Sequence, residues 1–557
     1  MSQRTPLVLL VVVLAIAAVL RLRGLDRELP HAPEPDSYLV LQTEILREGR
    51  GPDMKQSEKG FYAYPLPLAR GLALLPEAQA AADASLEEHL AVAGSDAFRG
   101  RALVALLSLL LVPGTWFLAQ RFTSPLGALV ASALVALSLL HLEFSQQARH
   151  HAPHASFALL TVLSALQLRA RPDWVRYLVS AALALLALGM LHSGWFALLP
   201  IVAAHVLRSR ECQRAPQWAV AAPVLACAFA WFALYPRIDG KLDQAASVSE
   251  GGHTLYWRDL DFSGFAKSAR LLFDYDPGLT ALATLGLLML LVHGRSLWRG
   301  AAAERRHDVL VVLAYALPYA LALGIYKETV DRMLLPLVPF LATLAALAAV
   351  GMANMLPARV RVLVVAITLA VPTLGAVRYA SVRDERDTFE QCAEWLVVNA
   401  GEERVVVSGR FNLPLAGDAH ALERVKDDHS SRQRRWMRYQ LEHGPLPQAR
   451  NVLAMPGRLF AGADPAKSKA RLERFLDEER PAWVVVDVSK YMRVNELMLE
   501  LRDWAVRHGT LAATFAGEPE ERAMEPALDY QDVPHLFARL LDAQAFGPTL
   551  EVYRIAR

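Results

Sequence analysis

Two carboxylates follow the first apolar stretch of the chain, in the segment Glu34-Pro35-Asp36-Ser37-Tyr38. Prolines before and between them keep the backbone extended. A carboxylate held just beyond a membrane helix could act as a general base for a hydroxyl group, or as a metal ligand. Asp36 also precedes a helical pattern that starts near Ser37, so a helix cap is the alternative interpretation.

A second polar block, His141 to His154, joins two apolar stretches and contains Glu143, Arg149, His150 and His151. Ionisable side chains close to a bilayer are costly and often functional, although any connecting loop at the interface is polar. The histidine spacing fits no familiar zinc site, so we predict no metal ion there. The block is a candidate for binding or orienting a charged substrate.

The third block begins at Tyr326 and contains Lys327, Asp331 and Arg332 before the proline-rich run that ends at Pro339. An arginine at headgroup level can bind a phosphate through two parallel hydrogen bonds. The alternatives are an internal salt bridge or a cation that reaches the interface along its apolar stem. Lys327 and Arg332 are therefore candidate phosphate ligands, with Asp331 lining the same site.

Eleven mostly apolar stretches must position these blocks. A membrane span needs about 20 such residues, and the apolar excess of the chain, 54% overall, lies before residue 380. We predict one or two amphipathic helices between residues 38 and 95. The predicted spans are 6–22, 101–120, 125–142, 153–169, 174–191, 194–208, 216–235, 277–294, 307–326, 332–353 and 359–379.

Arginine is concentrated in alternate connections between these spans, and short arginine-rich loops face the cytoplasm. The N-terminus is then cytoplasmic, and the tail after residue 380 is external because the number of spans is odd. The three polar blocks fall on the external side. The arginines of the cytoplasmic connections are Arg121, Arg169, Arg171, Arg176, Arg208, Arg210, Arg214, Arg295, Arg299, Arg305, Arg306, Arg359 and Arg361.

The tail predicts a separate α/β domain, because helical patterns at 387–400, 465–479 and 493–508 alternate with β-branched runs at 404–408, 482–488 and 550–554. It contains no glycine-rich nucleotide loop. We place the domain boundary between 1–380, with an external loop at 23–100, and 381–557.

Composition excludes several classes of protein. A formal net charge of +2 gives no reason to expect nucleic acid as a partner, and three cysteines spread over loop, membrane stretch and tail indicate no disulfide framework or metal knuckle. The first apolar stretch lacks a clear cleavage site, so we interpret it as a retained helix rather than a signal peptide.

In this order the motifs resemble the GT-C superfamily of membrane glycosyltransferases, in particular the dolichyl-phosphate-mannose protein mannosyltransferases and the lipid A aminoarabinose transferases. The resemblance rests on the acid-plus-aromatic segment 34–38, the aromatic-proline segment 61–68 with Tyr64, and the arginine-proline helix 331–339. It implies a mainly α polytopic membrane fold of about 11 spans with a C-terminal external α/β domain.

The resemblance also implies an activity. A sugar would pass, with inversion, from a polyprenyl-phosphate donor to a lipid, glycan or protein acceptor at the outer face. Asp36, with Glu34, would be catalytic. Arg332, Lys327, Arg149, His150 and His151 would bind the lipid phosphate, and Tyr38, Tyr64, Glu143 and Asp331 would line the acceptor side.

The chain departs from the family pattern at two positions. Pro35 separates the two acids that are adjacent in many relatives, a feature shared with oligosaccharyltransferase catalytic subunits. His150 stands where many relatives carry an acid after the arginine of the second external loop. A non-catalytic scaffold subunit therefore stays open as an alternative. A transporter is less favoured, because there are no repeated halves or matching glycine-interrupted helices.

The abundance of arginine over lysine and of alanine indicates a GC-rich bacterial genome. We therefore expect a multi-pass protein of the bacterial inner membrane, with undecaprenyl phosphate as the lipid and the tail outside the cytoplasm. A divalent cation, Mg²⁺ or Mn²⁺, is left open as a cofactor. The sequence does not identify the sugar or the acceptor.

Overall fold

The computed structural model groups the chain into two compact units. The first contains residues 1–23, 36–75 and 100–377, and the second contains residues 24–35, 76–99 and 378–557. The ranges that the structure describes are 4–31, 38–49, 66–81, 83–208, 216–234, 247–250, 253–300, 302–408, 411–428, 434–456, 459, 465–489, 496–528 and 532–556.

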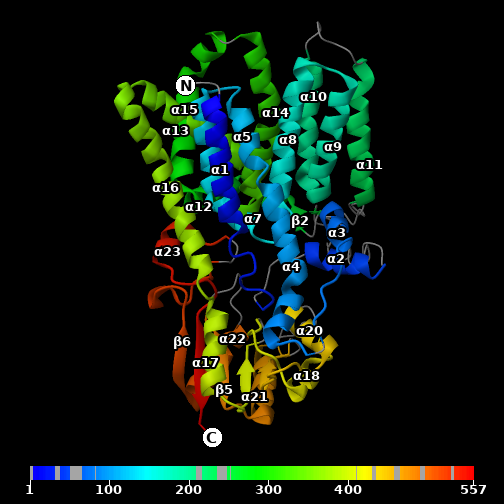
Figure 1. The fold of residues 1–557 in the computed structure, drawn as a ribbon, viewed down its shortest axis with the longest axis vertical. Coiled ribbons are helices and arrows are strands. Elements are labelled where there is room, and N and C mark those ends of the chain that lie inside the picture. The colour runs from blue at the N-terminus through cyan, green and yellow to red at the C-terminus, as the bar shows by residue number, and fades with distance from the viewer. Residues whose placement is uncertain are drawn as a thin grey trace. The chain divides into compact units, whose positions relative to one another are not determined.

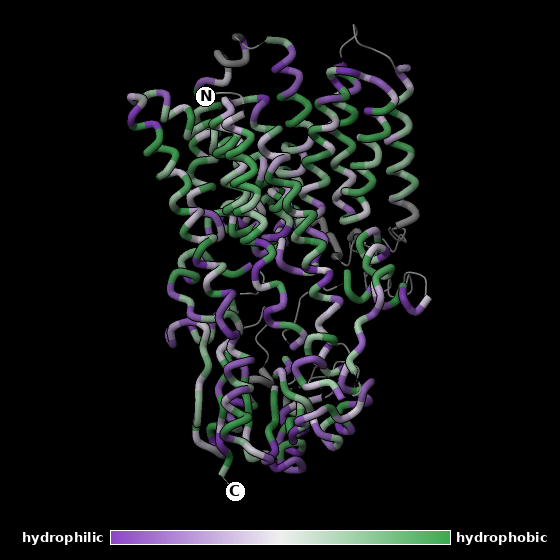
Figure 2. The backbone as a smooth tube through the Cα atoms, in the orientation of Figure 1, coloured by the Kyte–Doolittle hydropathy of each residue, from purple (hydrophilic) through white to green (hydrophobic). Residues whose placement is uncertain are grey.

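The first unit is built from long apolar helices that run beside one another (Figure 1). The residues along these helices are mostly hydrophobic, as Figure 2 shows. Its elements are α1 (Arg4–Leu22), α2 (Tyr38–Arg47), α3 (Leu66–Ala73), α5 (Leu111–Ala119), α6 (Pro125–Leu137), α7 (Leu139–Ser145), α8 (His151–Ala170), α9 (Trp174–Met190), η2 (His192–Ala197), α10 (Leu198–Val206), η3 (Gln217–Val220), α11 (Ala221–Leu234), β1 (Ser247–Glu250), β2 (His253–Tyr256), η4 (Trp257–Asp259), α12 (Ser263–Tyr275), α13 (Pro277–Gly300), α14 (Ala303–Ile325), η5 (Asp331–Leu337) and α15 (Val338–Asn354).

Two further helices contribute residues to both units, α4 (Leu86–Ser108) and α16 (Ala358–Asp384). All eleven predicted apolar stretches coincide with helices, which confirms the mainly α, polytopic fold. Within the described ranges, six helices are long and apolar enough to cross a membrane, or seven if the bent pair α6 and α7 is one span. The remaining predicted spans are shorter or more polar helices.

The span 125–142 is broken rather than continuous. Helices α6 and α7 meet at Ser138 with a bend of 53°. The first N–H groups of α7 are bound by a buried carboxylate, because Asp276 accepts from the Leu139 and Leu140 amides at 2.8 and 3.4 Å and from the Ser138 hydroxyl at 2.6 Å. A negative charge there also complements the helix dipole.

The end of α6 is bound by a charge of the opposite sign. The guanidinium of Arg21, buried in α1, donates to the carbonyl oxygens of Ala136 and Val135 at 3.0 and 3.2 Å. It also hydrogen-bonds Nδ1 of His141 at 2.9 Å. Backbone groups at a helix end cannot stay unpaired in an apolar environment. Arg21 and Asp276 therefore make the break possible, and the break sets the direction of α7.

Three of the predicted cytoplasmic connections carry residues that pair with one another. Arg169, at the end of α8, hydrogen-bonds Asp308 at 2.9 Å and Glu304 at 2.8 Å, both near the start of α14. Arg121 lies 3.6 Å from the same Asp308 carboxylate. Three connections that the sequence assigns to one side of the membrane are thus joined by ion pairs.

The second unit contains a five-stranded sheet of order β4-β3-β5-β7-β6. Strand β3 pairs in parallel with β4 and β5, whereas β7 is antiparallel to β5 and β6. Its elements are α17 (Thr388–Asn399), β3 (Val405–Val407), α18 (Ala419–Val425), α20 (Arg435–His443), β4 (Val452–Ala454), α21 (Pro465–Glu479), β5 (Trp483–Asp487), α22 (Glu496–His508), β6 (Gly509–Phe515), η7 (Glu520–Arg522), α23 (Leu536–Asp542) and β7 (Leu550–Ile555).

Apolar clusters cover both faces of this sheet. Val406 and Val484 point into a cluster with α21 and α22, and Val405 and Val485 point into one with α17. Alternation along β3 and β5 explains this two-sided burial. The predicted α/β tail is confirmed, including the helix 465–479 at its predicted bounds. Strands β4 and β6 and the short helices α18, α20 and α23 were not predicted.

Candidate active site

The turn between α7 and α8 carries most of the predicted phosphate ligands. It closes through backbone hydrogen bonds from Gln146 to Glu143 and from Arg149 to Gln147, at 3.1 and 2.7 Å. The Gln146 side-chain amide donates to the carbonyl oxygens of Leu20 and Arg23 at 2.8 and 3.0 Å. The turn is therefore fastened to the last residues of α1, from which the chain leads toward Asp36.

A close approach at Gly100 of α4 brings the start of α2 to the same turn. A Cβ atom at Gly100 would lie 3.1 Å from the Ala148 Cβ and 3.4 Å from the Leu39 side chain, and both side chains are fully buried. A Cβ atom at this position would fit only if Ala148 or Leu39 moved by a few tenths of an ångström. Leu39 follows Asp36 by three residues, and Ala148 precedes Arg149 directly.

Arg149, His150 and His151 are buried side by side. Arg149 is 0% exposed and lies 5.9 Å from the Phe144 ring, and the two imidazole rings stack with centroids 4.3 Å apart. Glu143, six residues before Arg149 and near the end of α7, is also buried. A guanidinium and two imidazoles are side chains that can bind an anion, so this group has the composition of an anion site.

Arg332 comes to this group from a distant part of the chain. Helix η5, on which it lies, packs against α8, and its charge acts on both His150 and His151, together with that of Arg149. Asp331, fully buried, accepts from the Tyr275 hydroxyl at 2.7 Å and from the Arg332 backbone amide at 2.6 Å. Asp331 thus orients the start of η5.

Lys327 does not join this group of neighbours. Its ammonium forms an ion pair with Asp259 at 2.7 Å, and its backbone amide donates to the Asp259 carbonyl at 2.9 Å. The Lys327 side chain is about one-third exposed. The structure therefore brings together four of the five predicted phosphate ligands, and gives the fifth a carboxylate partner.

His154 has a different role from the histidines before it. Its Nδ1 atom donates to the Ala187 carbonyl at 3.1 Å, and its Nε2 atom lies 3.4 Å from the Ser193 hydroxyl. A carbonyl can only accept, so Nδ1 carries the proton and the ring links α8 to the end of α9.

The predicted catalytic acids Glu34 and Asp36, and the acceptor-side Tyr64, lie outside the described residues. Tyr38 is the first residue of α2. The roles of Glu34, Asp36, Tyr38 and Tyr64 stay predictions.

Among the described residues, one group has ligand atoms close enough for a metal ion, namely His31, Asp387 and Glu390 of the second unit. Nε2 of His31 already hydrogen-bonds Asp387 at 2.9 Å, and the other Asp387 oxygen accepts from the Glu390 amide at 2.7 Å. These bonds are those of a paired histidine and a helix cap. We assign no metal ion to them.

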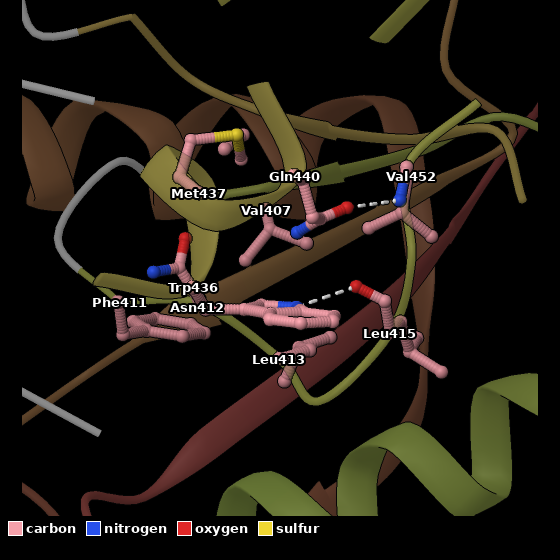
Figure 3. Close-up of a pocket in the computed structure, with 11 residues that line it drawn as sticks. Val407, Phe411, Asn412, Leu413, Leu415, Trp436, Met437, Gln440 and Val452 are labelled. Atoms are coloured by element: carbon pink, nitrogen blue, oxygen red, sulfur yellow. Dashed lines mark hydrogen bonds between the residues drawn. The ribbon is translucent and has the colours of Figure 1, made fainter. Parts of the chain in front are cut away.

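The second unit also encloses a cavity of about 20 Å³, enough for one water molecule. Figure 3 shows its lining, with Trp436 and Gln440 among mostly apolar side chains. The Trp436 indole donates to the Leu415 carbonyl, and the Gln440 side chain accepts from the Gly417 amide. The cavity is too small for a sugar, so we assign no substrate to it.

A family model, described as dolichyl-phosphate-mannose-protein mannosyltransferase, matches residues 85–236 of this chain. The predicted resemblance to membrane glycosyltransferases is confirmed. The matched residues include α5 to α10 and the whole turn with Arg149 and His150. A search of the curated proteins finds no match.

Solved structures give distant likenesses. An Archaeoglobus fulgidus oligosaccharyltransferase tethered with an acceptor peptide is 12% identical, with a TM-score of 0.46, over 87% of this chain and 69% of that one. The same organism's AglB, with an inhibitory peptide and a dolichol-phosphate, is 13% identical, with a TM-score of 0.45 and the same coverage. ArnT from Cupriavidus metallidurans, bound to undecaprenyl phosphate, is 13% identical, with a TM-score of 0.43, over 92% and 97%.

Sequence reasoning missed the side chains that hold the site in place. Arg21 and Asp276 were not among the predicted site residues. Their partners lie 115 and 138 residues away in sequence. The available signal was Ser138, a capping residue inside an apolar run.

Proposed function

We propose that this protein is an inverting glycosyltransferase that moves a sugar from a polyprenyl-phosphate donor to an acceptor at the outer face of the membrane. The observation that carries the proposal is the gathering of the buried Arg149, His150 and His151 with the half-buried Arg332. The family model that matches the turn supports it, since that family is described by a lipid-phosphate sugar donor.

The reaction is a single displacement. An acceptor hydroxyl loses its proton to Asp36, and its oxygen forms a bond to the anomeric carbon of the sugar. The bond from that carbon to the phosphate oxygen breaks, and the electron pair stays on the phosphate. The products are the glycosylated acceptor and the polyprenyl phosphate, with the configuration at the anomeric carbon inverted.

Arg332 and Arg149 stabilise the charge that develops on the leaving phosphate. Fixed donors in a site from which water is excluded act strongly on such a charge, and a guanidinium can hold two phosphate oxygens at once. His150 and His151 donate further hydrogen bonds. Because Lys327 is paired with Asp259, we place it at the edge of the site and not on the phosphate.

The position of Leu39 supports Asp36 as the base. Leu39 packs beside Ala148, the residue that precedes Arg149. Three residues of chain extend at most about 11 Å. The chain position of Asp36, three residues before Leu39, therefore agrees with a role beside Arg149.

The test is transfer from radiolabelled polyprenyl-phosphate sugars to an envelope extract, in membranes that contain the wild type or Asp36→Asn. We expect the variant to lose about 10²-fold or more of the rate. Asp26→Asn, a change of an exposed acid in the same connection, is the matched control and should keep the wild-type rate.

Unchanged transfer by Asp36→Asn would remove Asp36 from the chemistry. The absence of transfer with every common donor would favour the scaffold alternative over an enzyme.

A further inference from the structure

Helix α12, in the first unit, has a buried side and an exposed apolar side. Leu271 and Tyr275 are fully buried. Phe265 and Phe273 are 46% and 57% exposed, and Ala269, midway between them, is also exposed. At 3.6 residues per turn, these three positions fall on one side of the helix. An apolar side thus stays exposed on a helix that lies in a connection between two predicted spans.

Two cations flank this apolar side. Lys267 is half-buried and Arg270 is exposed, and the helical periodicity places both between the apolar side and the buried side. Arg270 lies 3.8 Å from the Asp274 carboxylate, one turn further along. An apolar side flanked by lysine and arginine is typical of helices that lie on a membrane surface.

Both ends of α12 are joined to the ends of helices that can cross a membrane. At its start, the Phe262 amide donates to the carbonyl of Ile325, the last residue of α14, at 3.1 Å. Near its end, the Leu272 carbonyl accepts from the Thr280 hydroxyl in the first turn of α13 at 2.8 Å. Residues 277–294 of α13 and the whole of α14 are long and apolar enough to be spans. Helix α12 therefore lies at the level where these two spans end.

The exposed apolar surface of α14 continues onto α12. Leu313, Leu317 and Leu321 are exposed along one side of α14, and Gly324 follows them at helical spacing. A Cβ atom at Gly324 would lie 2.3 Å from the Phe265 ring. The absence of a side chain at Gly324 thus lets the Phe265 ring cover the end of the leucine row.

We propose that α12 is an interfacial helix and that the outer leaflet of the bilayer covers its exposed side. Phe265 and Phe273 enter the acyl-chain region, and Lys267 and Arg270 extend along their apolar stems to the headgroup phosphates. The bilayer is the occupant because the leucine row of α14, which is continuous with Phe265, faces lipid in a membrane-spanning helix. The leaflet is the outer one in the predicted orientation.

The buried side of α12 carries part of the candidate site. Tyr275 donates to Asp331 at 2.7 Å, and Asp331 directly precedes Arg332. Contact of the phenylalanines with lipid therefore keeps the Tyr275 side of α12 on η5, against which it packs. This consequence rests on the proposed function, in which Arg332 binds the leaving phosphate.

The first experiment measures where α12 lies, without any need for activity. The full chain, with its three cysteines replaced by alanine, carries a single nitroxide at Phe273→Cys in vesicles of phosphatidylethanolamine and phosphatidylglycerol. Power saturation compares collisions of the label with oxygen, which concentrates in hydrocarbon, and with a water-soluble nickel chelate. Leu313→Cys near the middle of α14 and Val398→Cys, exposed in the second unit, are the reference labels.

We expect the ratio of oxygen to nickel accessibility at Phe273→Cys to lie between the high value at Leu313→Cys and the low value at Val398→Cys. A ratio equal to that at Val398→Cys would place the phenylalanine side in water and overturn the proposal. Low accessibility to both reagents would also overturn it, because a protein segment and not lipid would then cover α12.

The second experiment measures transfer in nanodiscs. Phe273→Ser makes the exposed side more polar, whereas Phe273→Leu keeps it apolar, and Val398→Ser is the matched control on an exposed valine of α17. We expect Phe273→Ser to lower the turnover number about tenfold through displacement of the site. Phe273→Leu should restore most of the rate, and Val398→Ser should match the wild type.

The two experiments separate this inference from the proposed function. Lipid exposure of the label together with an unchanged turnover number in Phe273→Ser would overturn the link between the membrane and the site. If the wild type transfers no sugar, the proposed function fails, and the accessibility ratio alone decides whether α12 lies in the leaflet.

Discussion

At the scale of single residues, the two cations near the phosphate-binding candidates differ in their partners. Arg332 acts electrostatically on the buried histidines, whereas Lys327 is neutralised by Asp259. Lys327 lies in this ion pair, whereas Arg332 lies beside the histidines that we propose as phosphate ligands. We therefore expect Arg332 to contribute more to the transfer rate than Lys327, although the two residues are only five positions apart in the sequence.

We predict that Arg332→Ala lowers the transfer rate about 10²- to 10³-fold, the usual cost of removing one donor to a developing negative charge. Lys327→Ala should cost less than about tenfold. Initial rates in nanodiscs at saturating donor would test both. Equal losses in the two variants would contradict the assignment of the phosphate to Arg332.

The pair of His31 and Asp387 predicts a pH dependence of stability. Burial alone would lower the pKa of His31, but the carboxylates of Asp387, Glu390 and Glu28 raise the pKa above its ordinary value of 6.5. A raised pKa means that the folded state binds the proton more tightly than the unfolded state. The stabilisation is complete below pH 6.5 and is lost as the pH rises through the folded-state pKa.

The melting temperature of the wild type should therefore fall relative to that of His31→Gln as the pH is raised from 6 to about 9. Parallel melting curves of the two proteins across this range would show that His31 does not titrate as the structure indicates.

At the scale of elements, apolar length predicted where helices lie but not where one is broken. The run 125–142 has no proline or glycine at the break, and local propensity therefore favours one continuous helix. The break exists because Arg21 and Asp276 supply partners for the exposed backbone groups from α1 and from the end of α12. Such partners are tertiary, and no local pattern contains them.

Removing one of these partners should weaken the first unit. Asp276→Ala leaves the first N–H groups of α7 without an acceptor, which typically costs about 1–3 kcal/mol per buried group. We expect a clearly lower melting temperature in detergent. Asp261→Asn changes an exposed acid in the same connection and should leave the melting temperature unchanged. A wild-type melting temperature for Asp276→Ala would mean that water replaces the carboxylate.

In the second unit, the predicted strands were confirmed where every residue of the strand is buried. Strands β3 and β5 are buried throughout and appear in the sequence as runs of valine. Strand β6 lies at the edge of the sheet, and its residues are mostly exposed. An edge strand of mixed polarity is not distinguished from a loop by its pattern, which explains why β6 was not predicted.

At the scale of the whole molecule, the feature that is clearest in the sequence is the alternation of arginine-rich and arginine-poor connections between spans. The ion pairs of Arg121 and Arg169 with Asp308 join connections that were all predicted to lie on one side. The grouping of residues 24–35 and 76–99 with the tail could not be predicted. It depends on contacts such as that of His31 with Asp387, 356 residues apart.

The predicted orientation rests on these charges and can be tested directly. We predict that a cysteine introduced at Arg299 reacts with a membrane-impermeant maleimide only after the cells are opened, because arginine-rich loops stay in the cytoplasm. A cysteine at the exposed Val398 should react in spheroplasts. The opposite pattern would reverse the topology and move the proposed site to the cytoplasmic face.

The broken helix also has a consequence for biosynthesis. Arg21 is made 115 residues before Ala136, and Ser138 is made 138 residues before Asp276. At 5–20 residues per second, the ribosome needs about 6–23 s to reach the first partner and a further 7–28 s to reach the second. Before Ala136 is made, we expect the Arg21 guanidinium to lie at the headgroups, where its apolar stem lets it reach water. The helices can therefore reach their final packing only after Asp276, at the end of α12, has been synthesised. Synthesis of this residue is thus a late step on which assembly of the first unit depends.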